Sequence, residues 1–218
     1  MSLLTVYSCS DKDSDENTMD LEVNFKIEYN GEPLVMFEEY EYPTGEPLTF
    51  NRFSFYLSNL AMNKTSGQSN LLDVQYLNFT NQNVDLAGAE EGITLNFPNT
   101  DIKDLENLFL MIGVDPTNNA KKPADFPSSN DLSKSGEYWG GWNSYVFTKT
   151  EGFITVDGEE VGYSLHTGSD DARVDFLLDG SEIGQDGKNR VEIVIDLWNY
   201  FGGVENTYDI KSNPQLHS

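Results

Sequence analysis

Apolar and polar residues alternate with a period of two along most of the chain. In residues 21–29 every odd position is apolar and every even position is Glu, Asn or Lys. The segment ends at Asn30-Gly31, a dipeptide typical of tight hairpin turns. This alternation is typical of a strand with one buried face. Similar short apolar or alternating segments follow at 33–42, 48–62, 72–79, 93–97, 108–114, 145–149, 153–156, 163–166, 174–178 and 191–197.

The turn signals and the scarcity of helical periodicity define the fold class. Turns are expected at Asp157-Gly158, Asp179-Gly180 and Asp186-Gly187, whereas helix is expected only as single turns at 101–107 and 198–201. We therefore predict an all-β protein, an antiparallel β-sandwich of about ten strands with one long loop and little helix. The expected organisation is a leader and acidic linker at 1–20, one domain at 21–210 and a disordered tail at 211–218.

One segment, residues 115–136, interrupts the strand pattern with three prolines and several Asn and Ser residues. Loops of this length in compact domains are usually functional or disordered. This loop leads into the densest aromatic cluster of the chain, Tyr138-Trp139-Gly140-Gly141-Trp142. We predict that it covers one end of the sandwich and that Trp139 and Trp142 form the candidate site. The alternative is a purely structural role, in which the two indoles cap that end.

Composition excludes several classes of function. A formal net charge of −24 repels phosphate backbones, so nucleic acid is not an expected partner. The single Cys excludes an internal disulfide and a thiolate cluster. With two His, one in the expected tail and one on a strand, and with no GxSxG or phosphate-binding glycine motif, neither a serine hydrolase nor a nucleotide-binding enzyme is expected. We predict a protein that is not an enzyme.

The N-terminal residues indicate a lipoprotein. Val6-Tyr7-Ser8-Cys9 resembles a bacterial lipobox, although the apolar stretch before it is too short for a complete signal peptide, so we expect a truncated leader. The acidic run after Cys9 resembles the export signal of Bacteroidetes surface lipoproteins. We predict that Cys9 is lipidated and that the protein lies in the cell envelope, anchored to the outer membrane by its lipid alone and exposed at the surface.

Several collinear blocks resemble the MbnP-like family, whose members are named for the partner protein of methanobactin copper operons. The blocks lie at 30–34, 45–59, 109–115, 138–152 and 165–168, and they include the sequence Trp139-Gly140-Gly141-Trp142-Asn143 and the segment Leu165-His166-Thr167-Gly168. The resemblance spans about 21–201. It implies a β-sandwich lipoprotein of the cell envelope that works with a dihaem cytochrome c peroxidase-like enzyme.

The resemblance also implies a metal site. In the characterised branch of the family, a tryptophan oxidised to kynurenine and two histidines hold copper. The family's tryptophans fall on Trp139 and Trp142, and its late histidine falls on His166. The early histidine is absent near Ile27 and Glu28. With one His and with Met36, Met62 and Met111 predicted as core, copper binding is expected to be weak.

A second hypothesis belongs to a different class of function. The same pair, Trp139 and Trp142, is also typical of a stacking platform beside polar groups. On this hypothesis the protein is a cell-surface module that binds glycan or protein.

Overall fold

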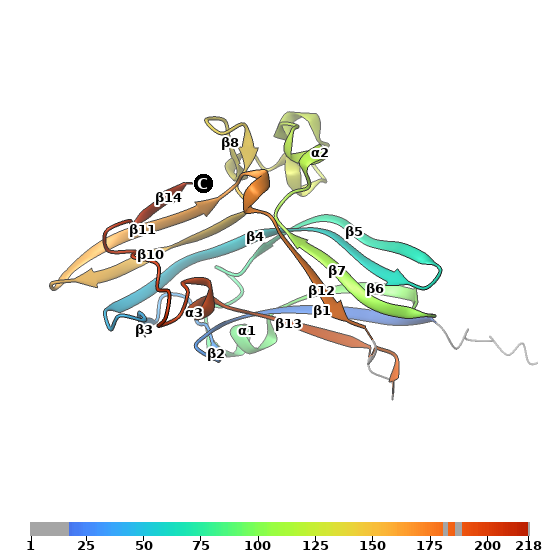
Figure 1. Ribbon diagram of the computed structural model, residues 1–218, viewed down its shortest axis with the longest axis horizontal. Helices are drawn as coiled ribbons and strands as arrows, with labels where there is room; N and C mark the ends of the chain where they lie inside the picture. Colours follow the sequence, from blue (N-terminus) through green and yellow to red (C-terminus); the bar gives the residue numbers. More distant parts are fainter. Residues whose placement is uncertain (1–17, 181–182, 186–188, 218) are drawn as a thin grey trace, which may run out of the picture.

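The computed structural model describes residues 18–180, 183–185 and 189–217 (Figure 1). Two sheets form the two layers of a sandwich, and a small hairpin lies with the long loop above the larger sheet (Figure 1). This arrangement confirms the predicted all-β sandwich with little helix. The predicted lipidation site Cys9, its acidic run and the predicted Asp186-Gly187 turn lie outside the described residues.

The smaller sheet is built around the first strand of the domain. It contains β1 (Thr18–Tyr29), β2 (Glu32–Pro33), β6 (Ile93–Asp101) and β13 (Arg190–Asp196). The β1–β2 and β1–β6 pairs are antiparallel, whereas β1 and β13 are parallel, with Phe25 opposite Ile193. The sandwich is therefore not purely antiparallel.

The larger sheet is organised by the 18-residue strand β4, whose two halves pair with different neighbours. The first half pairs with β3 and β10, and the second half pairs with β5 and β7. Strand β12 pairs with β7, and β11 pairs with β10 and, in parallel, with β14. The strands are β3 (Glu39–Glu41), β4 (Pro47–Lys64), β5 (Gly67–Asn78), β7 (Leu105–Ile112), β10 (Thr148–Val156), β11 (Glu159–Thr167), β12 (Val174–Asp179) and β14 (Gln215–His217).

Two hairpins form where their turn residues predict them. Asn30 and Gly31 have φ angles of 54° and 81°, and Asp157 and Gly158 have 52° and 85°. Two consecutive positive φ angles give the turn twist that matches the twist of paired strands, and Asn, Asp and Gly tolerate them best. These turns join β1 to β2 and β10 to β11.

The core between the sheets is rich in phenylalanine. The alternating residues of β1 face inward, as the pattern predicts, and Phe25 lies 6.2 Å from Phe55 between ring centroids. The ring of Phe55 in turn stacks on Phe79 at 5.9 Å. The predicted core residues Met36, Met62 and Met111 are all buried. None of these three side chains is therefore free to bind a surface metal ion.

The short helices correct two expectations. The turn predicted at 101–107 is occupied by the end of β6 and the start of β7, and an unpredicted helix, α1 (Leu86–Glu91), is capped by the side chain of Asp85. The turn predicted near Trp198 is present as α3 (Leu197–Tyr200), capped by Asp196. No helix in the described part of the chain is both long and apolar enough to cross a membrane.

The long loop folds as a series of single turns. It contains α2 (Pro116–Asn119), η1 (Pro123–Asp125), η2 (Asp131–Ser133) and η3 (Ser135–Glu137), and η4 (Asp170–Ala172) follows β11. Leu132 of the loop is fully buried in a second apolar cluster with Tyr56, Val114, Tyr145 and Phe147. Tyr56 alternates along β4 with the core residues Phe55 and Leu57, so the loop packs on the outer face of the larger sheet and not, as the sequence analysis expected, over one end of the sandwich. It carries the hairpin of β8 (Tyr138–Trp139) and β9 (Ser144–Tyr145).

Candidate functional site

The two tryptophans of the aromatic cluster lie against each other. Trp139 ends β8, and the backbone N–H of Trp142 donates to the Trp139 carbonyl at 3.1 Å, which closes the turn between β8 and β9. The ring centroids are 4.0 Å apart, and 37% of Trp139 is exposed. Trp139 therefore packs on Trp142 and still leaves part of its ring accessible to a ligand.

The two histidines of the chain lie on neighbouring strands. His166 of β11 stands directly opposite His217 of β14 in a parallel pair. Leu165 and Leu216, which alternate with the histidines along the two strands, face the core, so both imidazoles lie on the outer face of the larger sheet. Their ring centroids are 5.4 Å apart.

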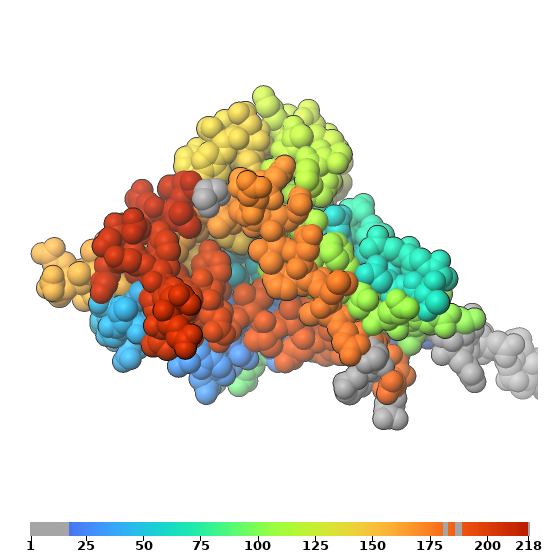
Figure 2. Space-filling view, in the orientation of Figure 1, coloured from blue at the N-terminus to red at the C-terminus, as the bar shows by residue number. Residues whose placement is uncertain are grey.

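His217 joins the histidine pair to the tryptophan pair. Its ring centroid lies 4.6 Å from that of Trp139 and 5.9 Å from that of Trp142. In Figure 2 the C-terminal segment, in dark red, adjoins the hairpin, in yellow. We call these four residues, Trp139, Trp142, His166 and His217, the Trp–His cluster.

This position of His217 corrects the sequence analysis. Residues 211–218 were expected to be a disordered tail, which left a single strong ligand, His166. Instead, Gln215–His217 pair with β11, and the N–H of Ser164 donates to the Pro214 carbonyl at 2.7 Å. A three-residue strand has too little periodicity to be recognised in a sequence, and its partner lies about fifty residues earlier.

A carboxylate orients the ring of His166. Nε2 of His166 lies 2.7 Å from Oε1 of Glu151 and 3.1 Å from Oγ of Ser164. The hydrogen bond from His166 is the main cause that lowers the pKa of Glu151, so this carboxyl stays ionised at neutral pH. With the proton held on Nε2, the neutral ring presents Nδ1 as its lone-pair nitrogen, the arrangement usual for metal-binding histidines.

A buried ion cluster supports the hairpin from below. Glu137, the last residue before β8, accepts a hydrogen bond from Arg52 at 2.9 Å and forms an ion pair with Lys149 at 2.6 Å. The Lys149 ammonium also donates to the Gly136 carbonyl at 2.8 Å. Glu137 and Lys149 are buried, so the two cations compensate the cost of placing this carboxylate in the interior.

Trp142 is held from its other side by Gly168, which follows β11. A Cβ at Gly168 would lie 2.6 Å from the Tyr145 carbonyl oxygen and 2.8 Å from the Trp142 ring. Any side chain there would therefore displace the indole. This close contact explains why the segment after His166 needs a glycine.

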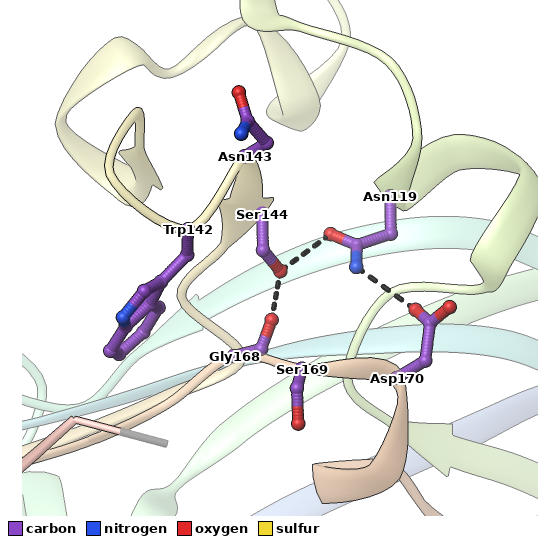
Figure 3. A pocket seen from close by; sticks show the side chains of 7 residues that line it. All are labelled: Asn119, Trp142, Asn143, Ser144, Gly168, Ser169 and Asp170. Atoms are coloured by element: carbon purple, nitrogen blue, oxygen red, sulfur yellow. Dashed lines mark hydrogen bonds between the residues drawn. The ribbon is translucent and has the colours of Figure 1, made fainter.

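A pocket of about 340 Å³ opens beside Trp142 (Figure 3). The polar side chains that line the pocket are already hydrogen-bonded to one another. The hydroxyl of Ser144 donates to Oδ1 of Asn119, and Nδ2 of Asn119 donates to Asp170 at 3.0 Å (Figure 3). Asn119 also accepts from the Tyr145 N–H at 2.9 Å. This buried asparagine, which the sequence analysis did not single out, fastens the loop to β9.

Few other residues near the cluster could hold a metal ion. No group of three or more His, Cys, Asp and Glu side chains converges anywhere in the ranges 18–180, 183–185 and 189–217. The donors at hand are the two imidazoles, with the Glu151 carboxylate bound to one of them. Imidazole nitrogens are ligands for Zn, Cu, Fe and Ni ions, whereas Mg²⁺ and Ca²⁺ prefer oxygen ligands.

The fold and the cluster together define a class, an all-β sandwich with an exposed Trp–His cluster on one sheet. The sequence profile of the MbnP family matches residues 18–218, and the chain belongs to this family. Among solved structures, MbnP from Methylosinus trichosporium is similar, with a TM-score of 0.56 and 15% identity, covering 85% of this chain and 78% of that one. A likeness at this identity supports the shared fold. No curated protein matches at a significant level.

Proposed function

We propose that this protein is a copper-handling member of the MbnP family that binds Cu(I) between His166 and His217. The observation that carries the proposal is the convergence of the only two histidines of the chain beside Trp139 and Trp142. The early histidine implied by the family resemblance is missing. In this proposal His217, from the opposite end of the chain, takes its place.

The donor set fits such an ion. Metal–imidazole bonds are about 2.0–2.1 Å long, so two imidazoles that share one ion have ring centres within roughly 6 Å of each other. The observed separation of 5.4 Å meets this condition. When bound, copper would supply a soft, one-electron redox centre.

The surrounding residues have separate roles in the proposal. Glu151 holds the proton on Nε2 of His166 and so keeps Nδ1 free to bind. Trp139 and Trp142 shield the ion on the hairpin side. Trp139 is the more exposed of the pair and has its ring closer to His217. It is therefore the indole that we propose a dihaem peroxidase-like partner oxidises to kynurenine, with hydrogen peroxide as the oxidant, cleavage of the C2–C3 bond and loss of C2 as formate.

The test is a competitive Cu(I) titration of the purified chain. We expect one-to-one binding that falls at least about 100-fold in both His166→Ala and His217→Ala. Trp198→Phe is the matched control, because Trp198 packs against Tyr29 of β1, away from the cluster, and should not change the affinity. No binding by the wild-type chain, or binding that survives both histidine substitutions, would contradict the proposal.

The location of the protein follows from the N-terminal interpretation. We propose that Cys9 is lipidated and that the chain is anchored in the cell envelope, at the outer membrane, facing outward. Fractionation of cells that express the gene tests this. Equal solubility of the wild type and Cys9→Ala would contradict it.

A second candidate function, a glycan-binding or protein-binding surface module, is favoured by one specific observation. The 340 Å³ pocket runs along Trp142 and is lined by Asn143, Ser169 and Asp170. An indole face beside amide, hydroxyl and carboxylate groups suits a sugar ring. Tryptophan fluorescence titration with oligosaccharides separates the two functions, since saturable quenching lost in Trp142→Ala but kept in His217→Ala would favour this candidate.

A further inference from the structure

A second hollow, separate from the Trp–His cluster, lies between the two sheets. It measures about 510 Å³, within the roughly 300–1,000 Å³ range of small-molecule sites. Its floor is formed by Phe53 and Phe55 of β4. Its mouth is bordered by β12 of the larger sheet and by β13 and α3 of the smaller one, and in Figure 2 it opens between the orange and red-orange surfaces of β12 and α3.

The hollow exists because β12 and β13 are edge strands that belong to different sheets. Within the described residues, β12 pairs with β7 alone and β13 pairs with β1 alone. No strand of the described chain bridges them, so the core is open to solvent at this edge. The apolar side chains at the mouth are correspondingly exposed, by 38–48% for Val174, Phe176, Val194 and Tyr200.

This grouping of exposed apolar residues differs from isolated apolar residues on the surface. A single exposed valine or leucine is ordinary, but four that surround an apolar hollow leave a contiguous hydrated surface whose burial is favourable by about 25 cal/mol per Å². The walls come from both sheets, so an occupant would be enclosed from two sides. The feature is a cavity with a buried floor, not a flat apolar face.

The polar groups of the hollow limit the kind of occupant. The hydroxyls of Thr148 and Thr167 are hydrogen-bonded to each other at 2.9 Å, so they do not require a hydrogen-bonding group on a ligand. At the rim, the Asp196 carboxylate accepts from the backbone N–H groups of Asn30 at 3.0 Å and of Trp198 at 2.9 Å. A fixed negative charge at the mouth of a chain with a net charge of −24 disfavours an anionic head group.

We propose that this inter-sheet hollow binds a single-chain amphiphile, with its alkyl or acyl chain against Phe53 and Phe55 and a neutral or cationic head beside Asp196. The chain covers the exposed apolar surface, and the head remains at the rim in water. The site is independent of the proposed copper function. Thr167 lines the hollow whereas His166, the preceding residue, lies on the outer face of the same strand.

The experiment is isothermal titration calorimetry of the full chain with three probes of equal chain length: decyltrimethylammonium, decanol and decanoate. The two ionic probes are used below their critical micelle concentrations and decanol below its solubility limit. We expect one-to-one binding of the cationic and neutral probes, with decanoate at least about tenfold weaker. Equal binding of decanoate would overturn the head-group assignment. Absence of binding by all three would overturn the site.

Variants locate the binding. Val194→Trp fills the mouth and should reduce the affinity at least about tenfold, whereas the matched control Val84→Trp, at a similarly exposed valine outside the hollow, should not change it. Ala172→Phe narrows the opposite wall and replaces Val194→Trp if that edge-strand variant does not fold. Equal affinity in the wild type and in the filled variants would show that the probes bind elsewhere. The Cu(I) titration of the same variants should remain unchanged, so failure of one proposal is distinguishable from failure of the other.

Discussion

The two apolar clusters of this protein are stabilised by different means. The large core between the sheets is mostly apolar, with Phe25, Phe50, Phe55 and Phe79 all fully or almost fully buried, and its few tyrosines, such as Tyr163, are a minority. The small cluster under the loop is built on tyrosines that make hydrogen bonds: Tyr145 donates to the Leu132 carbonyl at 2.7 Å and Tyr56 donates to the Asp131 carbonyl at 3.2 Å.

This difference means that one cluster mainly determines the stability of the fold, and the other mainly determines the geometry of the site. Apolar packing is non-directional and tolerates repacking, whereas hydrogen bonds and ion pairs specify the position of each group. The core therefore holds the two sheets together. The small cluster, with Glu137 and Asn119, fixes the position of the β8–β9 hairpin, which carries Trp139 and Trp142. Burial raises the pKa values of Tyr56 and Tyr145 above the usual value, so both phenols are protonated hydrogen-bond donors at neutral pH.

The largest expected effect tests the core. Phe55→Ala removes a ring that is 1% exposed and contacts Phe25, Phe53 and Phe79, so the free energy of unfolding should fall by about 3–5 kcal/mol in a denaturant titration. The control Phe153→Ala, at a ring that is 41% exposed, should change it by about 0.5 kcal/mol or less. Equal effects of the two substitutions would show that burial in the core between the sheets is not the main source of stability.

An intermediate effect is expected for the ion cluster. Glu137→Gln leaves Arg52 and Lys149 without their carboxylate; because Arg52 is partly exposed, the loss should be about 2 kcal/mol, below the roughly 3–5 kcal/mol of fully buried pairs. The near-ultraviolet circular dichroism of the adjacent Trp139–Trp142 pair should change as well. A stability loss without this spectroscopic change would mean that Glu137 does not position the hairpin.

The smallest effect concerns pH and Glu151. The folded-state pKa of Glu151 is lowered from 4.5, chiefly by its hydrogen bond with His166. Its contribution to stability is therefore fully present above the unfolded value and is lost as pH falls through the folded value. The difference in unfolding free energy between the wild type and Glu151→Gln should be small and should shrink as pH falls below about 4.5. A difference that grows on acidification would contradict this assignment.

The strands and hairpins were predictable because their causes are local. The alternation of residues 21–29 and the turns Asn30-Gly31 and Asp157-Gly158 depend on side-chain period and backbone φ angles, which each residue carries with it. The proline-rich loop and the adjacent tryptophans, Trp139 and Trp142, were likewise recognised from local composition, whereas His166 became a candidate site residue only through the family resemblance. The helix at Leu86–Glu91 was missed because it is only six residues long.

By itself, the sequence determined the class of fold, the acidic character, the buried methionines and three members of the Trp–His cluster, since hydrophobic period, charge and motif are properties of short segments. Only the tertiary structure shows that His217 is the fourth member of the cluster. His217 reaches the cluster because β14 pairs in register with β11, and the pairing of strands far apart in sequence depends on the whole sheet being assembled. The hollow between β12 and β13 is also a consequence of the tertiary structure. The distance between the edges of two sheets depends on how the sheets pack against each other, and no single strand determines it.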